Sequence, residues 1–215
     1  MLRSLKQLYG HKLGAKDGEI GQIKDFYFDD QNWTIRYLVA DTGNWLTGRK
    51  VLISPHSLAS LAVSGKIVDV GLTRKKIENS PTIDSQKPLS RQHEEEYYKY
   101  FGWRPYWKGD TAKIIGPQPQ PEAHLRSTQA VNGYLLRMGE ETIGHVCDFM
   151  VDGEAWTIGQ LVVKTGHRLS GQDMLIPVRQ VERISHEEST VFAHASLEAA
   201  EQIPANNLVP VGVVL

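Results

Sequence analysis

The chain has 215 residues, of which 24 are Lys or Arg and 25 are Asp or Glu, so its formal net charge is -1. This is the composition of an ordinary globular protein, and the length allows one large domain or two small ones. A near-zero charge argues against a protein that coats nucleic acid nonspecifically, because such binding requires a strong positive excess.

The first half of the chain reads as short strands. The apolar run from Ile20 to Phe28 predicts a strand that ends at the turn residues Asp29–Asn32. From Trp33 to Ala40, apolar residues alternate with a mixed set, as in a half-buried strand. The sequence therefore predicts an antiparallel hairpin over this stretch.

A second predicted hairpin has its tip at Thr42–Gly48, whose glycines supply unusual backbone angles, and its return strand at Val51–Ile53. Lys66–Val70 is predicted to form another short strand. With Arg49 and Lys50 behind it, the tip is also a candidate phosphate cradle. It lacks both the GxxxxGK[ST] spacing and a following helix, so the sequence favours a plain hairpin.

Residues 82–126 differ in character from the strands on either side. Ser90 is predicted to cap a short helix over Arg91–Tyr100 that ends at Gly102, and Pro117–Pro121 predicts a stiff extended linker. Between them lies a crowd of aromatic side chains, for which three interpretations stay open: a cap on the open end of a barrel, which we favour, a surface that binds a protein partner, or a platform that stacks nucleic-acid bases. The candidate partner-binding residues are Tyr97, Tyr98, Tyr100, Phe101, Trp103, Arg104, Tyr106 and Trp107, together with Arg49 and Lys50.

The second half of the chain repeats the first at an offset of 123 residues. Among the aligned pairs, Ile20-Gly21 meets Ile143-Gly144 and Asp25-Phe26 meets Asp148-Phe149. The offset predicts strands at Ile143–Val151, Thr157–Val163, Met174–Ile176 and Val191–Ala193, with a hairpin tip at Thr165–Gly171.

We interpret this repeat as a tandem duplication of a small domain. The expected organisation is one copy at residues 1–81, the helix, aromatic segment and linker at 82–126, a second copy at 127–205 and a tail at 206–215. Many short strands at close spacing predict an all-β fold with a short helix, in which each copy closes into a small β-barrel that hides its strand edges.

These residues resemble the PRC-barrel family, which is named for the cytoplasmic domain of the photosynthetic reaction centre H subunit and includes the carboxy-terminal barrel of the ribosome maturation factor RimM. The resemblance is carried by Gly18-Glu19-Ile20-Gly21 with Asp25-Phe26, by Tyr37-Leu38-Val39 and by Arg49–Ile53 after the glycine-containing hairpin. The segment from Lys87 to Trp107 is similar to the tail of stand-alone soluble bacterial members. The resemblance implies a β-barrel that acts as an adaptor in larger assemblies.

The residues suited to catalysis or metal binding do not form a recognisable motif. Eight histidines are scattered without an HxxxH or HExxH pair, so we expect surface or structural roles for them and no metal site. Ser54 and Ser57 flank His56 without a nucleophile elbow, which argues against a serine hydrolase. The histidines are His11, His56, His93, His124, His145, His167, His186 and His194.

Two aspartates of the first copy recur in the second copy, and their carboxylates have two interpretations. Asp25 recurs as Asp148, and Asp29 recurs as Asp152. Such carboxylates could handle protons, but an Asp more often accepts backbone N–H bonds at a turn, and we favour the turn.

Compartment and charge complete the sequence-based expectations. Cys147 is the only cysteine, which excludes an internal disulfide and suggests a reducing compartment. No window approaches the roughly 18 apolar residues of a membrane span, so we expect a cytoplasmic protein, with peripheral membrane association left open. Residues 1–81 carry about four excess basic groups and residues 127–215 about six excess acidic ones, which favours association of the two copies within one chain or in a homo-oligomer.

Taken together, these features predict a scaffold or adaptor without enzymatic activity or cofactor, whose partner is an unidentified protein. An RNA- or ribosome-associated role and a reaction-centre-like role in photosynthetic electron transport are the alternatives implied by the resemblance. A ligand-binding cleft between the barrels is a further alternative.

Overall fold

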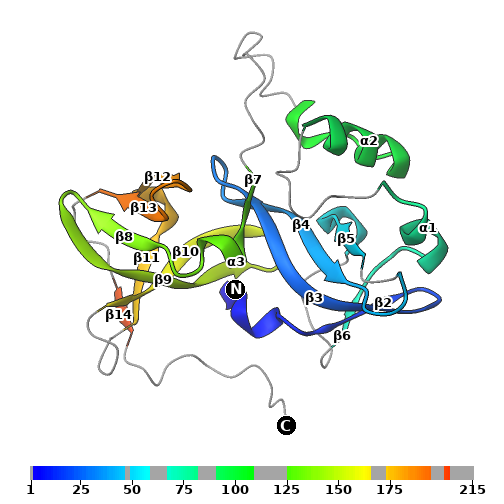
Figure 1. Ribbon diagram of the computed structural model, residues 1–215, viewed down its shortest axis with the longest axis horizontal. Coiled ribbons are helices and arrows are strands. Elements are labelled where there is room, and N and C mark those ends of the chain that lie inside the picture. The colour runs from blue at the N-terminus through cyan, green and yellow to red at the C-terminus, as the bar shows by residue number, and fades with distance from the viewer. Residues whose placement is uncertain are drawn as a thin grey trace. The chain divides into compact units, whose positions relative to one another are not determined.

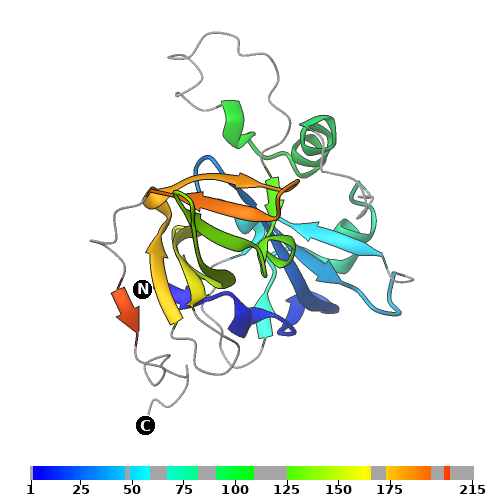
Figure 2. The ribbon, with the colours of Figure 1, turned by 60° about the vertical axis from the view of Figure 1, so that its left-hand side comes forward.

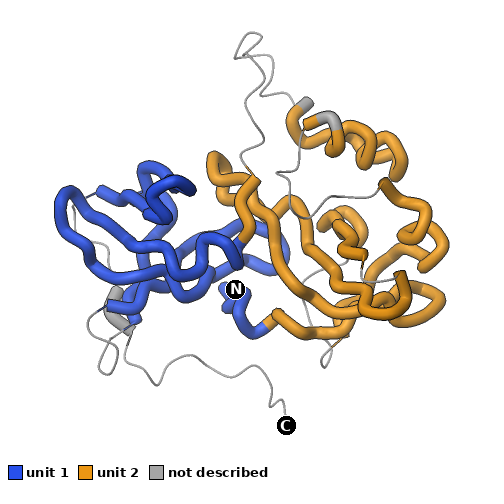
Figure 3. The backbone as a smooth tube through the Cα atoms, viewed as in Figure 1, with its two compact units in different colours: residues 1–7, 128–215 blue, residues 8–127 orange. Residues whose placement is uncertain are grey.

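The protein is described by a computed structural model that covers residues 2–46, 49–58, 67–81, 91–108, 125–165, 173–194 and 201–203. The chain folds into two compact units, coloured separately in Figure 3. Unit 1 comprises residues 1–7 and 128–215, and unit 2 comprises residues 8–127. These bounds differ from the predicted domains in one respect that matters below: the first seven residues belong with the second half of the chain.

Unit 2 is built on a sheet whose strands follow the order β5, β4, β3, β2 and β6 (Figure 1). Neighbouring strands are antiparallel except β6, which runs parallel to β2. A further short strand, β7, pairs with the end of β3. The strands are β2 (Lys12–Ala15), β3 (Gly18–Asp29), β4 (Thr34–Asp41), β5 (Lys50–Ile53), β6 (Ile67–Asp69) and β7 (Leu125–Ser127).

Among its described residues, unit 2 also has two α-helices and two short 3-10 helices. Helix α1 (Arg74–Glu78) is capped at its amino terminus by Thr73, whose side chain accepts a hydrogen bond from the N–H of Lys76. Helix α2 (Arg91–Phe101) follows later in the chain, and the 3-10 helices are Pro55–Ser57 and Tyr106–Lys108.

Unit 1 repeats the strand order, as β11, β10, β9, β8, β13 and β12, and again contains one parallel pair, β8 with β13. Figure 2 shows these strands, coloured from green to orange, as a curved sheet. Two short strands join it, because β1 pairs with β9 and β14 pairs with β11. The elements are β1 (Leu2–Ser4), α3 (Thr128–Val131), β8 (Leu135–Met138), β9 (Glu141–Asp152), β10 (Thr157–Thr165), β11 (Asp173–Pro177), β12 (Val181–Ser185), β13 (Thr190–Ala193) and β14 (Glu201–Ile203), with 3-10 helices at Lys6–Leu8 and Val178–Gln180.

The prediction of an all-β fold with few helices is confirmed, and the strands lie close to their predicted positions. Ile35, Tyr37 and Val39 are buried as the alternation predicts, but Leu38 and Ala40 on the opposite face are buried too, so the second half of this strand is covered on both faces. Trp33 itself precedes the strand, with a φ of 52°, and Trp156 has a φ of 58° at the matching place in unit 1. Strands β1, β2, β7, β8, β12 and β14 were not predicted, because they are short and their apolar pattern is weak.

A close backbone approach explains one glycine in each unit. A Cβ at Gly21 would lie 2.0 Å from the carbonyl oxygen of Asp41, and a Cβ at Gly144 would lie 2.2 Å from that of Lys164. Two neighbouring strands therefore come together at a distance that only glycine permits.

Several sequence-based expectations fall outside the described residues, namely the cap at Ser90, the linker Pro117–Pro121, the ends of both hairpin tips and the tail 206–215. Within the described part of the chain, no helix is long and apolar enough to cross a membrane.

Candidate functional site

The aromatic segment forms a cap on unit 2, made of helix α2 and the residues that follow it to Lys108; we call residues 91–108 the aromatic cap. The helix ends at Gly102, whose φ of 72° reverses the chain. The N–H of Trp103 donates to the carbonyl of Tyr98 over 3.0 Å, and the N–H of Gly102 donates to that of Lys99 over 3.2 Å. This paired bonding is a Schellman motif, so the predicted stop at Gly102 is confirmed with its physical cause.

One face of helix α2 is buried against the sheet. Tyr97, Tyr98 and Phe101 are 3%, 2% and 8% exposed, which fits the spacing of one helix face. The hydroxyl of Tyr97 donates to the carbonyl of Leu52 on β5 over 2.8 Å. The Tyr97 ring meets that of Tyr37 edge to face at 5.5 Å. These contacts attach the cap to the barrel.

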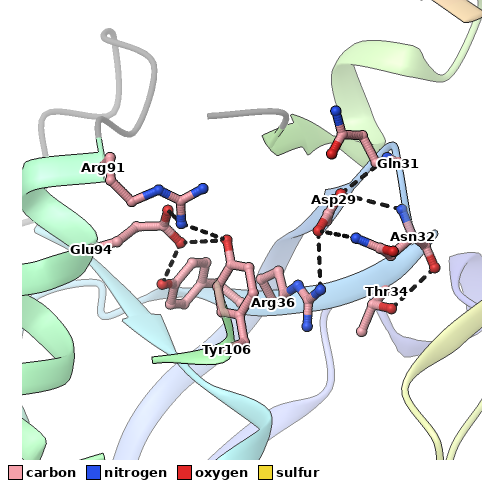
Figure 4. A network of polar contacts seen from close by, with 9 residues as sticks. Asp29, Gln31, Asn32, Thr34, Arg36, Arg91, Glu94 and Tyr106 are labelled. Atoms are coloured by element: carbon pink, nitrogen blue, oxygen red, sulfur yellow. Dashed lines mark hydrogen bonds and ion pairs between the residues drawn. The ribbon is translucent and has the colours of Figure 1, made fainter. Parts of the chain in front are cut away.

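One carboxylate of helix α2, that of Glu94, is fully buried. Glu94 is 0% exposed, and its Oε1 accepts hydrogen bonds from the hydroxyls of Tyr37 at 2.8 Å and Tyr106 at 2.9 Å. Its Oε2 accepts from the guanidinium of Arg91 at 2.8 Å (Figure 4). Three donors from three places in the chain therefore satisfy this buried acceptor.

Burial is the largest influence on the titration of this group. It raises the pKa of Glu94 above its ordinary value, and the hydrogen bonds from Tyr37 and Tyr106 and the charge of Arg91 offset only part of that effect. Burial and the nearby carboxylate of Glu94 also raise the pKa of Tyr37 and of Tyr106. Both phenols are therefore neutral donors at physiological pH.

A cation connects this cluster to the first hairpin. The guanidinium of Arg36 lies 3.8 Å from the centre of the Tyr106 ring and donates to Asp29 over 3.0 Å. Asp29 also accepts the N–H of Gln31 and of Asn32, at 3.0 and 3.3 Å. Burial raises the pKa of Asp29, but its hydrogen bonds with Asn32 and Arg36 outweigh burial and lower it. The turn role predicted for this Asp is thus present, with an ion pair that the sequence did not indicate.

The outer face of the cap has a different character. Tyr100 is 38% exposed, and Arg104 is exposed as well. Trp103, Tyr106 and Trp107 are half-buried, and Trp103 stacks on Phe101 at 4.5 Å. The predicted partner-binding residues therefore divide into a buried set, Tyr97, Tyr98 and Phe101, and a set that reaches the surface.

The comparison with protein families agrees with this architecture. Residues 8–74 match the family model of the PRC-barrel domain. The chain contains a PRC-barrel domain. No curated protein matches the chain. The matched residues span β2 to the start of α1, so the domain is the small β-barrel module on which the aromatic cap lies.

Two predicted basic residues of the PRC-barrel domain lie next to β5. Arg49 donates to the carbonyl oxygens of Glu78 at 2.9 Å and Ser80 at 2.5 Å, which are the carbonyls at the end of α1. Lys50 begins β5 opposite Asp41 and is half-buried. Arg49 therefore holds the chain after α1, and the structure does not bring it into the aromatic cap.

Asp25 of the PRC-barrel domain and its counterpart Asp148 lie within strands. Each accepts the N–H of the following residue, at 2.8 Å for Phe26 and 2.7 Å for Phe149. The predicted backbone acceptance is therefore present, but at an irregularity in strand pairing instead of a turn. Burial raises the pKa of Asp148, against hydrogen bonds that lower it, the first of them from Ser4.

Asp152 has the turn role that was predicted for it. It accepts the N–H groups of Glu154 and Ala155, both at 2.9 Å, and these bonds lower its pKa to about 2. Ser54 likewise has a local role, because its side chain accepts the N–H of His56 at the start of a 3-10 helix.

The remaining titratable candidates are dispersed. His56 lies against the rings of Tyr98 and Trp103, and Nδ1 of His186 is 2.6 Å from the Tyr134 hydroxyl. Burial, followed by the charges of Asp173 and Asp148, raises the pKa of the Cys147 thiol to about 11. Among the described residues, no three His, Cys, Asp or Glu side chains gather closely enough to hold a metal ion.

The sequence predicted the aromatic residues of the cap but not the buried hydrogen-bond cluster around Glu94. The sequence places Glu94 only within the predicted helix Arg91–Tyr100, and Arg36 and Tyr37 only within a predicted strand. A carboxylate one turn before a buried tyrosine was the available signal, since positions 94, 97, 98 and 101 follow the spacing of a single helix face.

Proposed function

We propose that this protein is a non-enzymatic adaptor that binds a protein partner through the outer face of the aromatic cap. The observation that carries the proposal is the two-sided construction of the cap. Its inner face is fixed to the PRC-barrel domain by the Tyr97 hydroxyl and the Glu94 cluster, so the outer face is held in one conformation. A preorganised surface loses less entropy when it binds.

The chemistry of the outer face fits a protein that presents a carboxylate. Tyr and Arg are enriched among the residues that dominate binding energy at interfaces. Among the described residues, Arg104 has no hydrogen-bond or ion-pair partner, so its guanidinium is available for a bidentate contact with Asp or Glu. Tyr100 lies four residues earlier and is 38% exposed, while its hydroxyl donates to the carbonyl of Lys76 over 2.9 Å.

A nucleic-acid role receives less support. That alternative comes from the family resemblance, and of its candidate contact residues Arg49 and Lys50, Arg49 uses its guanidinium on two backbone carbonyls of its own unit. An enzymatic role also receives less support, since Asp25 and Asp148 are engaged by hydrogen bonds and the thiol of Cys147 stays protonated at neutral pH.

Affinity capture with the full chain tests the proposal. Wild type is compared with Tyr100→Ala/Arg104→Ala, which alters the outer face and leaves the stacked pair of Phe101 and Trp103 in place. The matched control is Arg183→Ala, an exposed arginine stacked on Phe192 at 3.7 Å in unit 1. We expect one set of proteins to be captured by wild type and control and lost from the double variant. Equal capture by all three baits, with thermal unfolding unchanged, would contradict the proposal.

A further inference from the structure

Each unit contains one short strand whose three residues are the same, Leu-Arg-Ser. Strand β1 (Leu2–Ser4) pairs with β9 in unit 1, and strand β7 (Leu125–Ser127) pairs with β3 in unit 2. In unit 1, Ser4 is opposite Met150 and Leu2 is opposite Asp152. In unit 2, Ser127 is opposite Tyr27 and Leu125 is opposite Asp29, which is the same register at the 123-residue offset.

Both strands complete an edge that their long partner strand leaves half paired. Strand β2 covers β3 only from Gly18 to Gln22, and β7 takes the same edge from Tyr27 to Asp29. An uncovered strand edge presents unpaired N–H and C=O groups, and an added strand satisfies them.

The serine of each strand is held by the recurring aspartate. The hydroxyl of Ser127 donates to Oδ2 of Asp25 at 2.5 Å, and the hydroxyl of Ser4 donates to Oδ2 of Asp148. In unit 1 the N–H of Lys6 also donates to Asp148, at 2.9 Å, and the N–H of Leu5 donates to the carbonyl of Phe149. We call this arrangement, an acceptor edge with its aspartate, the strand-acceptor site.

The two Leu-Arg-Ser strands make the same contacts, but they are connected to their acceptor sites from opposite directions along the chain. Ser4 precedes Asp148 by 144 residues, whereas Ser127 follows Asp25 by 102 residues. One donor strand therefore reaches its site from the amino-terminal side and the other from the carboxy-terminal side. Recognition at these sites depends on the Leu-Arg-Ser strand itself and not on how it is tethered.

From this we infer that the strand-acceptor sites also bind the Leu-Arg-Ser strand of a second copy of this chain, which gives a strand-exchanged dimer. Within one chain the tethered strand has an effective concentration that reaches the millimolar range, so the monomer dominates in dilute solution. A second copy competes when chains fold together at high concentration, because the exchanged contacts are the same ones. The inference is independent of the adaptor role, since β1 and β9 belong to unit 1 and the aromatic cap to unit 2.

Disulfide trapping between two full-length chains tests this inference. One chain carries Ser4→Cys and the other carries Met150→Cys, both with Cys147→Ala, because Ser4 and Met150 are directly opposite each other. The two chains are unfolded together, refolded over a range of concentrations and oxidised. We expect an interchain disulfide that increases with concentration and, near the millimolar range, exceeds that of the control by about tenfold.

Two controls make each outcome decisive. A single chain with both cysteines must form the disulfide internally, which shows that the variants fold and that β1 pairs with β9. A partner chain with Glu141→Cys, at the far end of β9, gives the background of random contact. The inference is overturned if the internal disulfide does not form, or if the Met150→Cys chain is cross-linked no more than the Glu141→Cys chain at every concentration.

Discussion

The buried carboxylate of the aromatic cap supports a quantitative prediction. We consider Glu94→Ala, which removes the common acceptor of Tyr37, Tyr106 and Arg91. Removing one partner of a buried ion pair costs about 3 to 5 kcal/mol, since the groups left behind are desolvated without compensation. The side chain of Arg91 is 22% exposed and can recover some hydration, so we expect about 3 kcal/mol, the lower end of that range.

Two further variants separate the charge from the hydrogen bonds. Glu94→Gln keeps a carbonyl oxygen for the tyrosine hydroxyls but loses the charge opposite Arg91, and we expect a loss of about 1 to 2 kcal/mol. Glu95→Ala is the matched control, because Glu95 is the next residue of the same helix and is exposed. Its substitution should change the free energy of unfolding by no more than about 0.5 kcal/mol.

The assay is urea unfolding of the full chain, followed by tryptophan fluorescence and by far-ultraviolet circular dichroism. Trp103 and Trp107 belong to the cap, so fluorescence reports its loss, and the midpoint and slope give the free energy of unfolding. If Glu94→Ala were as stable as Glu95→Ala in both signals, Glu94 would not be the buried link between helix and barrel, and the reasoning would be refuted.

Three other predictions follow from contacts within unit 2. Because burial raises the folded-state pKa of Glu94, this residue contributes stability below its ordinary pKa of 4.5 that is lost as the pH rises through the folded-state pKa. The stability of wild type relative to Glu94→Gln should therefore fall as the pH rises above 4.5 in unfolding titrations, and a constant difference would contradict the raised pKa. Gly21→Ala should destabilise the protein by about 2 to 4 kcal/mol in calorimetric unfolding, because the added Cβ would meet a backbone oxygen and the φ of Gly21 is 131°. Gly14→Ala is the control, because its Cβ would make only ordinary contacts, and it should cost under about 1 kcal/mol. Tyr97→Phe should lose about 1 kcal/mol in urea unfolding, since only the hydrogen bond to Leu52 is removed; no loss would show that the hydroxyl does not secure the cap.

The tandem duplication of the barrel stays a prediction, and several paired features of the two units agree with it. The strand order, the left-handed Trp33 and Trp156 and the close approach at Gly21 and Gly144 recur in both units. The turn aspartates behave alike as well. The family match covers residues 8–74 only, so the duplication rests on these internal parallels and on the 123-residue offset.

Local patterns in the sequence determined the elements of this protein. The alternation around Ile35 and Tyr37 marked a half-buried strand, Asp29 marked a turn, and Gly102 marked the end of helix α2. Each of these depends on residues close in the chain, since period, turn chemistry and helix capping act over a few positions. The crowd of aromatic residues likewise marked the candidate site before any contact was known.

Tertiary structure decided which of these elements meet. The sequence could not show that Tyr97 is buried while Tyr100 is partly exposed, that Glu94 meets Tyr37 across 57 positions, or that residues 2–4 pair with the second half of the chain. Strand pairing and buried polar contacts join groups that are far apart in sequence, and an apolar pattern specifies which face is buried without specifying its partner. The Leu-Arg-Ser strands show this difference, because the same three residues complete matching edges in different units, and their sequence alone does not say which unit each strand joins.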